Sequence, residues 1–113
     1  MKQLFLATVF SICATGLAAH SPLSATTPAD QAVIAEAPSE IAMTFKGTIR
    51  LTRVVMTIDD QPGVDLDLSG HSGFTSDYAI PLPAMGPGSY VIDWRGLGSD
   101  GHALKGAFRF DVK

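Results

Sequence analysis

The chain has a single cysteine, Cys13, and it lies close to the amino terminus. A domain that begins after this position has neither a thiol nor a disulfide. The chain also lacks any cluster of lysine and arginine, because its eight basic residues are scattered among eleven acidic ones, for a formal net charge of −3. Nucleic acid is therefore not an expected partner.

No apolar run reaches the ~20 residues that a membrane-spanning helix needs. The chain instead begins with a positive charge at Lys2, a mostly apolar stretch from Leu4 to Ala14, and the small residues Gly16, Ala18 and Ala19. This order is typical of a secretory signal peptide over residues 1–19, and a membrane anchor is the weaker alternative. A single domain over residues 20–113 is expected to follow, and it would be exported if the signal is used.

The position of signal cleavage decides which residue begins the mature chain. Cleavage after Ala19 makes His20 the first residue. Cleavage after Ala18 fits the small-residue rule slightly better and leaves Ala19 in front of His20. These rules do not choose between the two.

Alternation of apolar and polar residues dominates the rest of the chain and predicts strands. Tyr90, Ile92 and Trp94 share one face of an expected strand, and Phe108, Phe110 and Val112 share one face of the last. About seven short strands with frequent turns favour an all-β fold, a Greek-key β-sandwich or barrel of immunoglobulin-like type.

Some local features of this fold can also be predicted. Residues 20–29 are expected to form an extended lead-in, and residues 31–37 a loop with at most one helical turn. A strand over residues 41–46 is expected to be broken by Gly47. A phase change in the next apolar pattern predicts a β-bulge near Thr52 and Arg53.

Asp100 and His102 are separated only by Gly101. In an extended segment residues two apart point to the same side, so a carboxylate and an imidazole would face one point. We interpret this point as half of a metal site. The alternative is a plain Asp-Gly hairpin turn with a surface histidine.

The other half of the site is expected at His20, whose amine and ring nitrogen can chelate one ion if it begins the mature chain. With His102 and Asp100 the set has three nitrogens and one oxygen. A tetragonal set of this kind suits Cu(II), which binds more tightly than the other divalent ions, whereas Zn(II) would take the same donors tetrahedrally.

The remaining metal-binding residue types are expected to be structural. His71 lies in a Gly/Ser loop and is expected to be solvated. Met43 and Met56 fall on strand faces and are expected in the core. Met85 is expected to be exposed, and one methionine does not make a thioether site.

Several motifs in this order resemble the copper-resistance protein C (CopC) family of periplasmic copper carriers. The resemblance covers essentially the whole length after the leader and rests on His20 and the segments Ser24-Ala25-Thr26-Thr27-Pro28-Ala29-Asp30, Ala37-Pro38-Ser39-Glu40-Ile41-Ala42-Met43-Thr44-Phe45, Gly86-Pro87-Gly88-Ser89-Tyr90-Val91-Ile92-Asp93-Trp94-Arg95, Ser99-Asp100-Gly101-His102 and Gly106-Ala107-Phe108-Arg109-Phe110.

The resemblance implies a cupredoxin-like β-sandwich that is not an enzyme and binds one Cu(II) per chain through His20, Asp100 and His102. It favours cleavage before His20, and it implies sequestration of copper or its transfer to an inner-membrane copper transport protein. A monomer is expected.

Many members carry a Met-rich loop for Cu(I), but residues 59–65 contain neither methionine nor histidine. We therefore expect a single Cu(II) site without a Cu(I) site.

Two other classes of function remain open at this point. One is a copper-dependent oxidative enzyme, since an N-terminal histidine also binds copper in lytic polysaccharide monooxygenases. The other is a metal-free immunoglobulin-like interaction module, which would not depend on Asp100 or His102.

Overall fold

The computed structural model describes residues 22–83 and 85–113, and these residues form seven strands. The strands are β1 (Leu23–Thr27), β2 (Ala32–Ile34), β3 (Glu40–Ile58), β4 (Val64–Asp65), β5 (Thr75–Pro81), β6 (Gly88–Gly98) and β7 (Ala103–Val112). The predicted all-β fold of about seven strands is confirmed. The described ranges contain no helix long and apolar enough to span a membrane.

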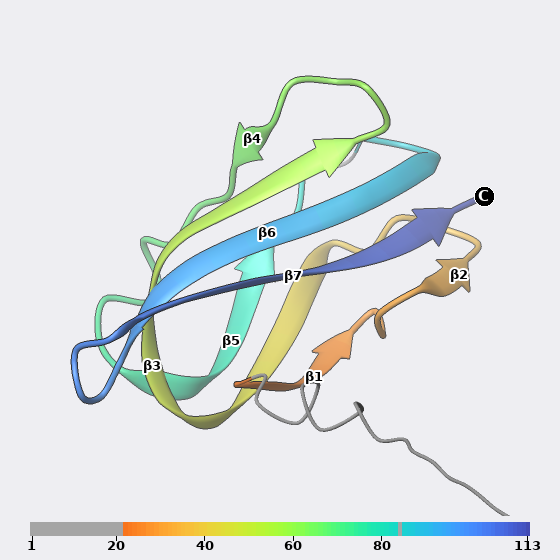
Figure 1. The fold of residues 1–113 in the computed structure, drawn as a ribbon. Coiled ribbons are helices and arrows are strands. Elements are labelled where there is room, and N and C mark those ends of the chain that lie inside the picture. The colour runs from red at the N-terminus through yellow and green to blue at the C-terminus, as the bar shows by residue number, and fades with distance from the viewer. Residues whose placement is uncertain (1–21, 84) are drawn as a thin grey trace, which may run out of the picture.

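The long strand β3 connects the two layers of the fold. Its first half pairs with β1 and β5, whereas its second half pairs with β6 and β4. Figure 1 shows β3 bending near its middle, so that the sheet curls over itself. The strand order β1-β3-β6-β7-β2 then places β6 at the centre, between β3 and β7. Because β6 has a partner on both sides, the hairpin that it forms with β7 is well anchored.

The inward faces of these strands make one apolar core, and their alternation matches the predicted pattern. The largest fully buried side chains are those of Trp94, Tyr90 and Phe110. Burial of a large apolar side chain contributes ~1.5–3 kcal/mol to stability, so the central hairpin carries much of the folding free energy. Met43 and Met56 are each 1% exposed, which confirms them as core residues, and Met85 is exposed as expected.

The local predictions near β3 had mixed outcomes. The register of the β3–β6 pair shifts between Leu51 and Arg53, which confirms the predicted bulge. The predicted break at Gly47 was wrong, because β3 runs through it and bends where it exchanges β5 for β6 as its partner. Residues 23–27 of the expected lead-in do form an extended edge strand.

The prediction of a loop over residues 31–37 was also wrong. Ala32, Val33 and Ile34 form β2, which pairs in parallel with the end of β7. Asp30 fixes the start of this pairing, because its carboxylate accepts a hydrogen bond from the backbone N–H of Arg109 at 3.0 Å.

Candidate metal centre

The turn between β6 and β7 carries two of the three predicted metal ligands. The backbone N–H of Gly98 donates to the carbonyl of His102 at 2.8 Å, and the N–H of Gly101 donates to the carbonyl of Gly98 at 2.9 Å. Gly101 has φ 88°, a left-handed conformation that favours glycine over any residue with a Cβ. The turn therefore depends on the glycine that separates Asp100 from His102.

The two side chains face each other as predicted. Oδ2 of Asp100 lies 2.7 Å from Nδ1 of His102, and Oδ1 accepts a hydrogen bond from the backbone N–H of His102 at 3.1 Å. The side chains are 66% and 82% exposed, respectively. The pair is thus held together by its own turn and is accessible to an ion from solution.

Each of the two groups shifts the pKa of the other. The hydrogen bond from the His102 ring lowers the pKa of Asp100 below its ordinary 3.8, and the His102 backbone N–H adds to this effect. The hydrogen bond to Asp100, together with its negative charge, raises the pKa of His102 above 6.5. Asp100 therefore loses its proton more readily than an isolated carboxyl, and His102 keeps its proton to a higher pH than an isolated imidazole, so a metal ion competes with a proton for this ring.

The spacing of these atoms fits a metal ion. Nitrogen and oxygen ligands lie about 2 Å from a first-row divalent ion, which puts adjacent ligands of a square arrangement about 2.8 Å apart. The 2.7 Å between Oδ2 and Nδ1 is close to that value. An ion can thus replace the shared proton with little movement of the backbone.

The predicted third ligand does not belong to this turn. Within residues 22–83 and 85–113 there is no group of three or more His, Cys, Asp or Glu side chains that could hold a metal ion. His20, the third predicted ligand, lies outside the described residues, as does the predicted cleavage site.

The path of the first described residues bears on whether His20 can reach the turn. Leu23 pairs with Phe45, and the N–H of Lys46 donates to the carbonyl of Pro22 at 2.8 Å. The start of β1 therefore lies at the bend of β3. At the same bend Ile49 pairs with Gly98, the last residue of β6. Figure 1 shows the start of β1, the bend of β3 and the β6–β7 turn at one end of the molecule.

His71 is not the solvated histidine that the sequence predicted. Its side chain is half-buried, its ring nitrogen Nε2 lies 2.9 Å from the carbonyl oxygen of Ala79, and its ring packs against Tyr78 with centroids 4.9 Å apart. The Tyr78 hydroxyl in turn donates to the carbonyl of Ile49 at 2.7 Å. His71 thus helps to fix the loop before β5 to the bend of β3, a contact between loop and strand that the local sequence does not indicate.

Comparison with known proteins identifies the family of the chain. Residues 23–113 match the family model described as the CopC domain. The chain is 30% identical to copper resistance protein C of Escherichia coli over 84% of this chain and 82% of that protein. It is 26% identical to copper resistance protein C of Xanthomonas campestris pv. juglandis over 91% and 87% of the two chains.

Solved structures share the fold. CopC from Methylosinus trichosporium OB3b superposes with a TM-score of 0.69 at 23% identity, over 83% of this chain and 94% of that one. PcoC, described as a methionine-rich copper resistance protein from Escherichia coli, superposes with a TM-score of 0.58 at 24% identity, over 83% and 99%. With the family model matched from β1 to the carboxyl terminus, the chain belongs to the CopC family of copper resistance proteins.

Proposed function

We propose that this protein is a periplasmic carrier that binds one Cu(II) ion through His20, Asp100 and His102. The observation that carries the proposal is the Asp100–His102 pair, whose facing atoms lie 2.7 Å apart on an exposed turn in a member of a copper resistance family. Signal cleavage before His20 would supply an amine and a second imidazole. The role is sequestration of copper or its transfer to an inner-membrane copper transport protein, without catalysis.

The chemistry of the available donors supports Cu(II) over Cu(I). The pair offers a nitrogen and an anionic oxygen, which suit Cu(II), whereas Cu(I) prefers thiolate and thioether sulfur. Met43 and Met56 are buried in the core and cannot ligate an ion without unfolding. Residues 59–65 contain no methionine, and Met85 alone does not provide a thioether site. We therefore propose a single Cu(II) site.

The test is a Cu(II) titration of the mature monomeric protein. Trp94 is the only tryptophan and lies in β6, the strand that leads into the turn, so quenching of its fluorescence by Cu(II) provides the readout. We expect one equivalent to bind. His102→Ala removes a ligand and should weaken binding by more than about 100-fold, a larger loss than follows when a residue that only hydrogen-bonds to a ligand is removed. His71→Gln is the matched control and should bind copper like the wild type.

The EPR spectrum of the loaded protein tests the donor set directly. We expect three coordinated nitrogens, two of which belong to His20. Equal affinities of the wild type and His102→Ala would contradict the site and favour a metal-free interaction module. Peroxide turnover that depends on copper and reductant, well above that of free copper, would instead favour the enzyme class.

A further inference from the structure

Basic residues gather on one face of this acidic protein. Five of the eight basic residues project from the outer face of β3, β6 and β7, and all five are exposed: Arg50, Arg53, Arg95, Lys105 and Arg109. They face away from the core because they alternate with buried residues along each strand. The scattered positions in the sequence hide this concentration, which appears only when the three strands pair.

Three of these side chains form a row across the strands. Arg53 pairs in register with Arg95, and Arg95 pairs with Lys105. Like charges placed directly opposite each other destabilise a sheet. Arg53 is partly neutralised by Asp65, whose Oδ1 lies 2.8 Å from its Nε. Neither Arg95 nor Lys105 has a carboxylate within 4.0 Å among the residues that the structure describes. The row therefore retains unbalanced positive charge.

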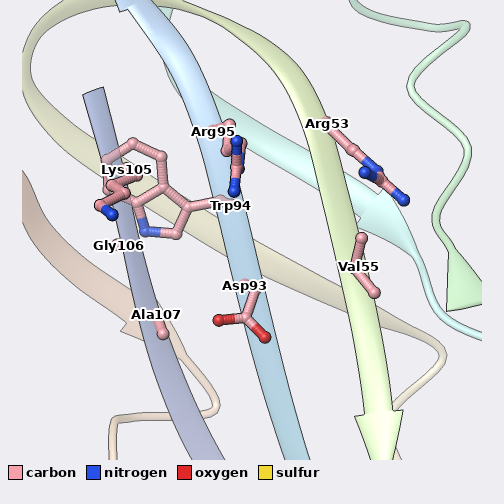
Figure 2. Close-up of a pocket in the computed structure, with 8 residues that line it drawn as sticks. All are labelled: Arg53, Val55, Asp93, Trp94, Arg95, Lys105, Gly106 and Ala107. Carbon is pink, nitrogen blue, oxygen red and sulfur yellow. The ribbon is translucent and has the colours of Figure 1, made fainter. Parts of the chain in front are cut away.

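The surface beside this row is hollowed. A depression of about 550 Å³ is lined by the row together with Val55, Asp93, Trp94, Gly106 and Ala107, so its lining carries three cationic side chains and one carboxylate. Figure 2 shows the Arg53 and Arg95 side chains at this depression, with Asp93 next to them along β6. A second depression of about 360 Å³ shares Arg95 and Lys105 and continues along the hairpin past Leu97. An extended ligand can thus lie along the face.

We propose that this face docks an acidic, carboxylate-rich segment of a partner protein. Guanidinium groups form paired hydrogen bonds with carboxylates, and a row of cations along a groove matches successive acidic side chains. An anionic membrane fits less well, because the protein as a whole is negatively charged. The large hydrophobic residues that the described chain exposes are Val33, Phe74 and Met85, and none of them lines either depression, where a lipid-inserting side chain would be needed.

The docking face lies close to the proposed copper site, so a partner bound to it could exchange copper with the protein. This inference rests on the proposed copper function. Arg95 precedes Asp100 by five residues on the same hairpin, so the two lie at most about 17 Å apart at the rise of a strand. When the acidic segment of a partner binds to this face, the partner's residues that flank the segment lie next to the proposed copper-binding turn. The docking face would then hold a copper donor or acceptor within reach of Asp100 and His102.

The test uses a fluorescein-labelled peptide of alternating glutamate and glycine, with glutamine replacing glutamate in a control peptide. We expect the acidic peptide to bind, and binding to weaken as ionic strength rises. Arg95→Glu should weaken it by about tenfold, whereas Lys113→Glu, which makes the same change in net charge beyond the end of β7 and remote from the row, should change it less than twofold. Amide shifts in an NMR titration should map to β3, β6 and β7.

Several results would overturn the proposal. Equal weakening by Arg95→Glu and Lys113→Glu would mean that only the total charge matters. Binding to vesicles containing one-quarter phosphatidylglycerol, but not to the peptide, would assign the face to a membrane. Self-association that Arg95→Glu abolishes would assign it to a second copy of the chain. Failure of the copper site is distinguishable, because His102→Ala should lose copper and still bind the peptide.

Discussion

The pKa of the His102 imidazole is set by the carboxylate of Asp100, only two residues away. Its pKa lies above the ordinary 6.5 because the protonated ring donates to Asp100 and is attracted by its charge. A pKa raised by folding means that the protonated ring stabilises the native turn at acidic pH. This contribution disappears as the pH rises through the raised pKa. Copper binding has the opposite dependence on pH and is favoured as the pH rises, because the ion needs the deprotonated ring nitrogen.

We therefore expect Asp100→Asn to lower the pKa of His102 towards its ordinary value. An amide can accept a hydrogen bond from the ring but carries no charge, so part of the shift should remain. NMR titration of the His102 ring protons in the copper-free protein measures this change. An unchanged pKa in the variant would mean that Asp100 does not hold the ring in solution.

Copper affinity should fall as the pH drops below the pKa of His102. Protons then compete with the ion for this ring as well as for the proposed amine of His20. Competition titrations at a series of pH values, with calorimetry to count the protons released, provide the measurement. Affinity that stays constant as His102 becomes protonated would contradict its role as a ligand.

Gly101 sets the geometry of the turn through its backbone. At φ 88° an alanine would cost about 1–2 kcal/mol, although its Cβ would meet no atom within 4 Å. Gly101→Ala should therefore lower stability and weaken copper binding by reorienting Asp100 and His102. Gly47→Ala is the matched control, because Gly47 is equally open and has no positive φ. Thermal unfolding and copper titration of both variants compare the two; equal behaviour would show that the turn does not require Gly101.

At the scale of strands, the β6–β7 hairpin depends on close packing at one glycine. A Cβ on Gly106 would lie 2.7 Å from a carbon of the Trp94 ring, which is itself 1% exposed. The ring also contacts Phe45 edge to face at 5.1 Å between centroids. It cannot move away from β7 without disturbing the opposite layer.

Gly106→Ala should consequently destabilise the protein by roughly 1–3 kcal/mol, the usual cost of overpacking a core. Urea denaturation gives the change in the free energy of unfolding. Gly70→Ala, where a Cβ would meet no atom within 4 Å, should have little effect. If the two variants were equally stable, β7 would be free to shift away from Trp94.

The strands that could be predicted from the sequence are those whose own residues determine them. In β6 and β7 a strict alternation separates buried from exposed residues, so both strands and the Asp100–His102 turn were predicted correctly. β2 was missed because three residues, Ala32 to Ile34, carry too short a pattern, and their pairing partner lies in β7, far along the chain. The continuity of β3 through Gly47 was missed for a similar reason. Its strand conformation is maintained by β1, β5 and β6, none of which is local.

At the scale of the whole molecule, the site that we propose would join the two ends of the proposed mature chain. The pair on the β6–β7 turn could be predicted because its residues are two apart. The cationic face could not, since Arg53, Arg95 and Lys105 come from three strands and meet only through register. The position of the first described residues likewise depends on β1 pairing with β3 just before its bend.

The amine of His20 should bind copper only when His20 begins the chain. A protein that starts at His20 offers an amine and a ring to the same ion, whereas one that starts at Ala19 displaces the amine by a residue. Acetylation of His20 removes the amine as a donor altogether. We expect the acetylated protein to bind Cu(II) more than about 100-fold more weakly and to lose one nitrogen from its EPR spectrum. Thermal unfolding of the copper-free protein should be unaffected, since β1 begins three residues later at Leu23. If acetylation left copper binding unchanged, Asp100 and His102 would have to bind the ion with a different third ligand.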